Sequence, residues 1–209
     1  NNIATYPDGN LAAQLKVIAQ LISGGLGTKI YVANIGGFDT HANQVQLGET
    51  DVLANRNHAV LLKDVSDAIT AFTDDLKELG IHERVVGMTF SEFGRQIKAN
   101  NSLGTDHGTA APLIVFGDCV KQGIYGDNPE ITENIAPQEG VPMQYDFRSV
   151  YASLLIDWMG ASETDIRNVL YSDFQKIPFI KDCRDTTSVD KIAQGIVATL
   201  SPNPCVDFT

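Results

Sequence analysis

Short apolar segments alternate with segments of helical periodicity along this chain of 209 residues, and this alternation limits the possible folds more than any other feature. Residues 29–35 (KIYVANI), 84–90 (RVVGMTF) and 112–116 (PLIVF) are nearly continuous apolar runs. Such runs are typical of strands that are covered on both faces. We therefore expect an α/β fold in which these segments are neighbours in a mixed or parallel sheet, with helices on both faces.

The segments around these runs have the spacing of amphipathic helices. Apolar residues recur every three or four positions in residues 10–22, 51–79 and 147–159, and a shorter helix is expected over 162–170. Glycine follows each of the three longer segments, where it can adopt the left-handed conformation that ends a helix.

The charge balance and the length of the apolar runs exclude two kinds of partner. The chain has 15 Lys and Arg against 26 Asp and Glu, and its formal net charge of -11 repels the phosphate backbone of nucleic acids. Its apolar runs are far shorter than the roughly 20 residues that a membrane-spanning helix needs. We expect no nucleic-acid partner and no membrane span.

The three cysteines, Cys119, Cys183 and Cys205, lack the paired C-x-x-C spacing of a structural zinc site. They are expected as buried or unpaired thiols or, in an oxidising compartment, with one disulfide between Cys183 and Cys205.

Polar loops at the ends of the expected strands carry the residues best suited to chemistry, because ligands of open α/β sheets bind where such loops converge. The candidates are Asp39 and His41 after the first strand, Glu92 and Arg95 after the second, and Asp106 and His107 before the third. Carboxylate with imidazole is a ligand set for zinc, iron or manganese.

The spacing leaves alternatives open for these loops. Asp39 and His41 can bind one ion only if the chain turns at once, and otherwise they form a hydrogen-bonded pair that stabilises the loop. Glu92 is either a ligand or an ion-pair partner of Arg95. Among the other polar residues, we expect His58 half-buried, His82 exposed, and the hydroxyls of Ser91 and Thr105 in helix-capping or loop hydrogen bonds.

Four motifs in order resemble the family called domain of unknown function 1501: IGGFDTHANQ (35–44), TFSEFGR (89–95), GTDHGTAAP (104–112) and YDFRSVYA (145–152). The likeness covers about residues 6–180. That family is similar in fold to the alkaline phosphatase and sulfatase superfamily, whose members use two metal ions. The resemblance implies that residues 1–183 are the C-terminal half of an alkaline-phosphatase-like α/β domain. It also implies that the absent N-terminal half, or another chain, covers an exposed apolar edge of the sheet.

The same resemblance implies roles for individual residues. Asp39 and His41 are similar to superfamily ligands that follow a central strand, and His107 is similar to a later histidine ligand. Glu92 and Phe93 stand where phosphatases carry an Asp-His pair, so one imidazole ligand of a two-metal site is missing. We expect a divalent ion (zinc, manganese or calcium) on Asp39, His41, Asp106 and His107, with Glu92 and Arg95 as catalytic residues.

A second resemblance lies near the C-terminus. Residues 188–192 (SVDKI) and 197–204 (VATLSPNP) resemble the linker and opening strand of a C-terminal sorting domain of the type IX secretion system. The expected domains are therefore the core over 1–183, a linker over 184–195 and the start of the sorting domain over 196–209. The alternative is a C-terminal arm that packs on its own domain.

Together the two resemblances imply an exported protein of the Bacteroidetes group, secreted or on the exterior of the outer membrane, with the type IX machinery as partner. Two functions are expected from them: a metal-dependent hydrolase of phosphate or sulfate esters, or a non-catalytic binding or structural cargo with a degenerate site.

Overall fold

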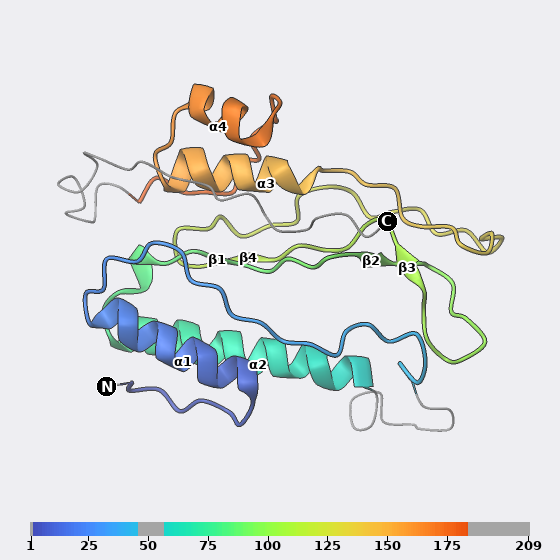
Figure 1. The fold of residues 1–209 in the computed structure, drawn as a ribbon, viewed down its shortest axis with the longest axis horizontal. Helices are drawn as coiled ribbons and strands as arrows, with labels where there is room; N and C mark the ends of the chain where they lie inside the picture. The colour runs from blue at the N-terminus through green and yellow to red at the C-terminus, as the bar shows by residue number, and fades with distance from the viewer. Residues whose placement is uncertain (1, 46–56, 184–209) are drawn as a thin grey trace, which may run out of the picture.

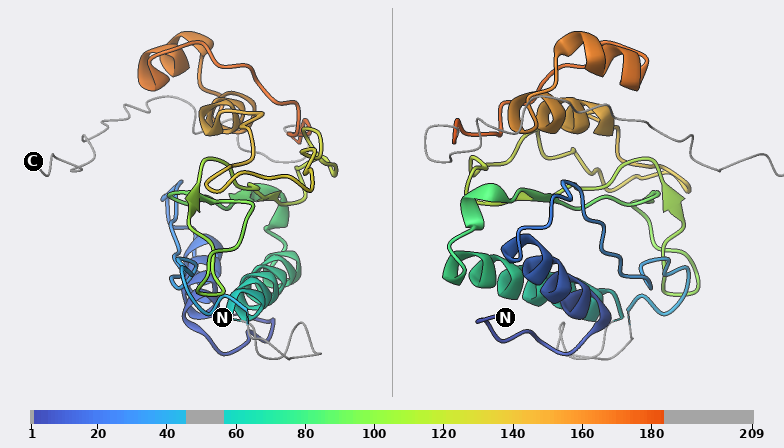
Figure 2. Two further views of the ribbon diagram at one scale, coloured as in Figure 1. Left: turned by 90° about the vertical axis from the view of Figure 1, so that its right-hand side faces the viewer. Right: turned by 60° about the vertical axis from the view of Figure 1, so that its left-hand side comes forward.

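The computed structural model describes residues 2–45 and 57–183 and has a mixed α/β fold in three layers (Figure 1). Helices α1 (Asn10–Ser23) and α2 (Asn57–Glu78) lie side by side on one side of a layer of extended chain. Helices α3 (Phe147–Ser153) and α4 (Glu163–Leu170) lie on the other side, and the views in Figure 2 show the same order. The expectation of an α/β fold is confirmed in this general sense.

The helices form where hydrophobic periodicity and capping residues predict them. The first part of the expected long helix, residues 51–56, lies outside the described residues, and α2 is followed by Gly80 with a φ of 70°. Helix α3 continues into a π-helical segment, η2 (Leu154–Trp158), so the two together account for the expected helix over 147–159. Helix α4 is capped by Ser162, whose hydroxyl accepts the backbone N–H of Asp165.

The strands are shorter than expected and pair differently. After a short helix, η1 (His82–Arg84), strand β1 (Gly87–Met88) pairs with β4 (Val115–Phe116). Strand β2 (Gly94–Arg95) pairs with β3 (His107–Gly108), and both pairs are antiparallel. The expected mixed or parallel sheet of three neighbouring segments is therefore not formed among the described residues.

Residues 29–35 form no strand in the described part of the chain, and the backbone groups of Asn34 bond to a side chain of α1 rather than to a neighbouring strand. The N–H of Asn34 donates to Oε1 of Gln14 at 3.0 Å, and Nε2 of Gln14 donates to the carbonyl of Asn34 at 2.8 Å. Ile30 and Val32 are 67% and 69% exposed, whereas Ala33 packs on the core. The expectation of burial on both faces is wrong for this segment.

Two hydrophobic cores lie on opposite sides of the extended layer. The buried residues of the first core come from α1 and α2: Ala12, Leu15, Ala19, Ala68, Phe72 and Leu76. Those of the second core are Val150, Ile177, Phe179 and Ile180. Val85 packs on the first core and the next residue, Val86, on the second, as the alternating side chains of an extended chain require.

A disulfide joins Cys119 to Cys183, with 5.9 Å between their Cα atoms. The isolated bridge between Val120 and Ile180 lies beside it and brings the two cysteines together. Both sequence expectations for Cys183, an unpaired thiol or a bond to Cys205, are therefore wrong. Residues 184–209, which include the expected linker and the expected start of a sorting domain, lie outside the described residues.

Two further expectations concerned the exposure of His82 and the absence of a membrane-spanning helix. His82 is half-buried rather than exposed, and its Nε2 lies 3.4 Å from a carboxylate oxygen of Asp118. No helix within residues 2–45 and 57–183 is long and apolar enough to cross a membrane.

Asp75 is a fully buried carboxylate on α2 that holds the start of the described chain. It accepts the backbone N–H groups of Ile3 at 2.8 Å and Ala4 at 3.1 Å, and also the side chains of Asn2 and Tyr6. Burial alone would raise the pKa of Asp75, but these hydrogen bonds outweigh it and hold the pKa below its ordinary value of 3.8.

We expect Asp75→Asn to destabilise the protein by about 2–4 kcal/mol near pH 7, because an amide cannot replace an ionised acceptor of several hydrogen bonds. Since the folded-state pKa is lowered, the contribution of Asp75 is complete above pH 4 or so and declines as the pH falls further. Urea unfolding between pH 3 and 7 should show the difference from wild type shrinking at the acid end. The exposed neighbour gives the matched control, Asp74→Asn, and equal effects of both variants would contradict the prediction.

Candidate metal centre

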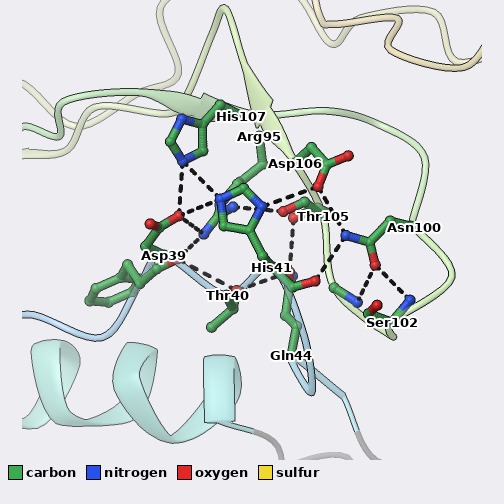
Figure 3. Close-up of polar contacts among 12 residues, drawn as sticks. Asp39, Thr40, His41, Gln44, Arg95, Asn100, Ser102, Thr105, Asp106 and His107 are labelled. Carbon is green, nitrogen blue, oxygen red and sulfur yellow. Dashed lines mark hydrogen bonds and ion pairs between the residues drawn. The ribbon is translucent and has the colours of Figure 1, made fainter.

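The candidate site lies where a loop and a hairpin meet. Asp39 and His41 are in the turn that follows residues 29–35, and His107 is on β3, directly opposite Arg95 of β2 in the antiparallel register. Figure 3 shows their side chains pointing toward one another.

Main-chain hydrogen bonds lock the turn that carries His41 against the turn that precedes His107. The N–H of Thr105 donates to the carbonyl of Thr40 at 3.2 Å, and the N–H of Asn43 donates to the carbonyl of Ser102 at 3.0 Å. Gly104 packs so closely on the main chain of His41 that a side chain would not fit between them. The two segments that carry the histidines are therefore held in a fixed relative position.

Three potential ligand atoms converge in this site. Oδ1 of Asp39 lies 3.0 Å from Nε2 of His41 and 2.9 Å from Nε2 of His107, and the two Nε2 atoms are 3.1 Å apart. Ligands held by bonds of roughly 2 Å at tetrahedral angles lie roughly 3.3 Å apart, so the spacing suits one ion. The side chains are 57%, 48% and 47% exposed, which leaves the group open to solvent.

These three residues could hold a metal ion, and their chemistry favours some ions over others. Two imidazoles and one carboxylate suit zinc, manganese or iron. Calcium prefers oxygen ligands, so it fits this donor set poorly.

Asp106 lies on the other side of the His41 ring from Asp39. Its Oδ1 is 3.1 Å from Nδ1 of His41 and accepts a hydrogen bond of 3.0 Å from Asn100. The bond from Asn100 and then that from His41 lower the pKa of Asp106. The sequence predicted Asp106 as a ligand, but here it orients His41, as carboxylates next to metal-bound histidines commonly do.

The guanidinium of Arg95 bonds to other residues of the site. Its guanidinium donates to the carbonyls of Thr105, at 2.7 Å, and Phe38, and Nη2 lies 3.2 Å from Oδ1 of Asp39. The hydrogen bond from His107 is the main cause that lowers the pKa of Asp39, and the positive charge of Arg95 adds to it. Arg95 therefore holds the carboxylate of Asp39 in place, and its own side chain is only 19% exposed.

Glu92 does not join this group. It is exposed, and within residues 2–45 and 57–183 it has no ion-pair partner, so the expected pairing with Arg95 is wrong. The hydroxyl of Ser91 donates to the carbonyl of Phe93, and that of Thr105 donates to Oε1 of Gln44. Both are loop hydrogen bonds, as expected, and that of Thr105 joins two loops distant in the sequence.

Sequence reasoning missed three residues that shape the site: Gln44, Asn100 and Phe93. Oε1 of Gln44 accepts hydrogen bonds from Thr40 and Thr105 and so ties the two turns together. The one available signal was the turn-forming composition of residues 100–104 (NNSLG), which predicts a tight loop but not the partner of Asn100.

Comparison with protein families identifies one match. The family model described as "Protein of unknown function (DUF1501)" matches residues 18–160, a span that contains every candidate site residue. Comparisons with curated proteins and with solved structures give no match. Because the family model covers more than half of the chain and includes the motifs that form the site, this protein belongs to the DUF1501 family.

Proposed function

We propose that this protein binds one divalent metal ion through Asp39, His41 and His107 and is a metal-dependent hydrolase of phosphate or sulfate esters. The observation that carries the proposal is the convergence of one carboxylate and two imidazole atoms within 3.1 Å of one another on solvent-exposed side chains. Catalytic metal sites differ from structural ones in keeping a position open for water or substrate.

The residues of this chain would each have a defined part in such a reaction. A bound divalent ion would supply Lewis acidity and an activated water. Asp106 fixes the ring of His41, and Arg95 fixes the carboxylate of Asp39. The superfamily resemblance supports an ester as the substrate.

One observation favours the second candidate, a metal-binding protein without turnover. The guanidinium of Arg95 already serves two carbonyls and Asp39, and Glu92 lies outside the group. A guanidinium that already has three partners and a Glu92 outside the group of three support metal binding without turnover.

Zinc titration tests metal binding, which both candidate functions require. We expect the wild type to bind one equivalent, and His107→Ala to bind about 100-fold more weakly because it removes one of three ligands. The matched control His82→Ala removes a histidine far from the site and should bind as the wild type does. Failure of the wild type to bind, or equal binding by His107→Ala, would refute the metal site.

Assays of the metal-loaded protein with p-nitrophenyl phosphate and p-nitrophenyl sulfate then separate the two candidates. Hydrolysis that disappears in His107→Ala supports the enzyme. Stoichiometric binding without turnover supports the non-catalytic protein.

We also propose that the protein is exported, as a cargo of the type IX secretion machinery. The Cys119–Cys183 disulfide supports an oxidising compartment, because disulfides are rare in the cytosol of mesophiles. Removal of residues 195–209 should leave the protein inside the cell with its fold intact, which cell fractionation and circular dichroism would show. Normal export of the shortened chain would refute the sorting role.

A further inference from the structure

The two histidines of the site are oriented in different ways. Both ring nitrogens of His41 have partners, since Nε2 faces the ligand group and Nδ1 faces Asp106. In His107 only Nε2 is bonded within the described residues, and Figure 3 shows its contacts reaching a single ring nitrogen. A histidine ligand usually has its second nitrogen held by a hydrogen bond, so something else must set the ring of His107.

The aromatic ring of Phe93 is in the right place to do so. It stacks on the imidazole of His107 with 3.6 Å between ring centroids and 14° between ring planes. The backbone explains this contact. The register of β2 and β3 pairs Arg95 with His107, and Phe93 lies two residues before Arg95. An extension of the ladder by one residue therefore places Phe93 diagonally across from His107 on the same face.

Phe93 also closes a ring of four side chains. The guanidinium carbon of Arg95 lies 5.2 Å from the centroid of the Phe93 ring, and the guanidinium is ion-paired with Asp39. Asp39 in turn is bonded to His107, which stacks on Phe93. Each member of this cycle limits the movement of the next, so a loss of the aromatic face would release His107 first.

We infer that Phe93 is a positioning residue that holds His107 for metal binding, an inference that rests on the proposed metal site. Stacking fixes the plane of the imidazole, and the diagonal position fixes which edge faces Asp39. Nδ1 of His107 can then bond to solvent, and the orientation of Nε2 does not depend on that bond.

Zinc affinities of three variants of the full chain test this role. Phe93→Leu keeps an apolar side chain but removes the ring, and we expect about tenfold weaker binding with little change in the melting temperature of the metal-free protein. Phe93→Tyr keeps the ring face and should restore the wild-type affinity. The matched control is Phe90→Leu at an exposed position three residues away, and it should have no effect.

Cobalt substitution and proton NMR supply readouts that a purely structural role would not change. The visible spectrum of the cobalt-loaded protein should change in Phe93→Leu and not in Phe93→Tyr. In the metal-free wild type, the ring protons of His107 should be shifted upfield relative to those of His41, because they lie over the face of Phe93.

The outcomes distinguish this inference from the proposal on which it rests. Zinc binding by the wild type with equal affinity in Phe93→Leu would overturn the role of Phe93 and leave the metal site standing. Weakened binding in Phe93→Tyr to the same extent as in Phe93→Leu, or His107 ring protons without an upfield shift, would also overturn it. Absence of zinc binding in the wild type would refute the metal site and the role of Phe93 together.

Discussion

Replacement of both Cys119 and Cys183 by serine is expected to lower the free energy of unfolding by about 4 kcal/mol. The bond closes a loop over a sequence separation of 64 residues, and a cross-link over that length strongly restricts the unfolded chain. It also joins the turn after β4 to the segment that carries Ile177, Phe179 and Ile180 of the second core.

Denaturant unfolding under non-reducing conditions measures this effect. The matched control is Cys205→Ser, which removes the third cysteine and should leave the stability unchanged. Peptide mapping of the unreduced wild type should recover Cys119 and Cys183 in one linked pair. Recovery of a Cys183–Cys205 pair, or equal destabilisation by Cys205→Ser, would contradict the Cys119–Cys183 pairing.

Gly104→Ala is expected to destabilise the protein by about 3 kcal/mol through overpacking and to weaken zinc binding about 100-fold. A Cβ atom at this position would overlap the main-chain carbonyl of His41. Backbone atoms cannot rotate aside as a side chain can, so the turn carrying His41 must move away from the turn preceding His107.

Gly27→Ala is the matched control for this prediction, because no atom lies within 4 Å of a Cβ built at Gly27 and its φ is not in the left-handed region. At such a site the change should be neutral or slightly stabilising. Chemical denaturation and zinc titration of both variants check the prediction. A Gly104→Ala variant that binds zinc like the wild type would show that the two turns need not be locked together.

Hydrophobic periodicity predicted the helices well, because an amphipathic helix carries its signal within one stretch of chain. Residues 84–90 and 112–116 contain β1 and β4, which pair with each other, whereas residues 29–35 form no strand in the described part of the chain. Their pairing could not be read from the sequence, since it depends on contacts between distant segments. The bonds between Gln14 and Asn34, for example, satisfy groups that the sequence alone would assign to a neighbouring strand.

The sequence predicted which residues form the candidate site better than it predicted the role of each residue. The sequence predicted Asp39, His41 and His107, because short motifs of acidic residues and histidines in polar loops can be recognised without a structure. Which nitrogen of His41 faces Asp106 depends on the position of a turn about 65 residues away, and no local pattern encodes it. The stacking of Phe93 likewise follows from a strand register that the sequence leaves undetermined.

The solvent-facing side chains of Ile30 and Val32 have a consequence for how the protein behaves at high concentration. An extended segment with exposed β-branched side chains is a template for association with another copy. The formal net charge of -11 opposes such encounters at neutral pH and low salt. Screening shortens the range of that repulsion from roughly 10 Å in 0.1 M salt to roughly 3 Å in 1 M salt. Salt and acid should therefore both lower the solubility of this protein, the first by shielding its charge and the second by neutralising it.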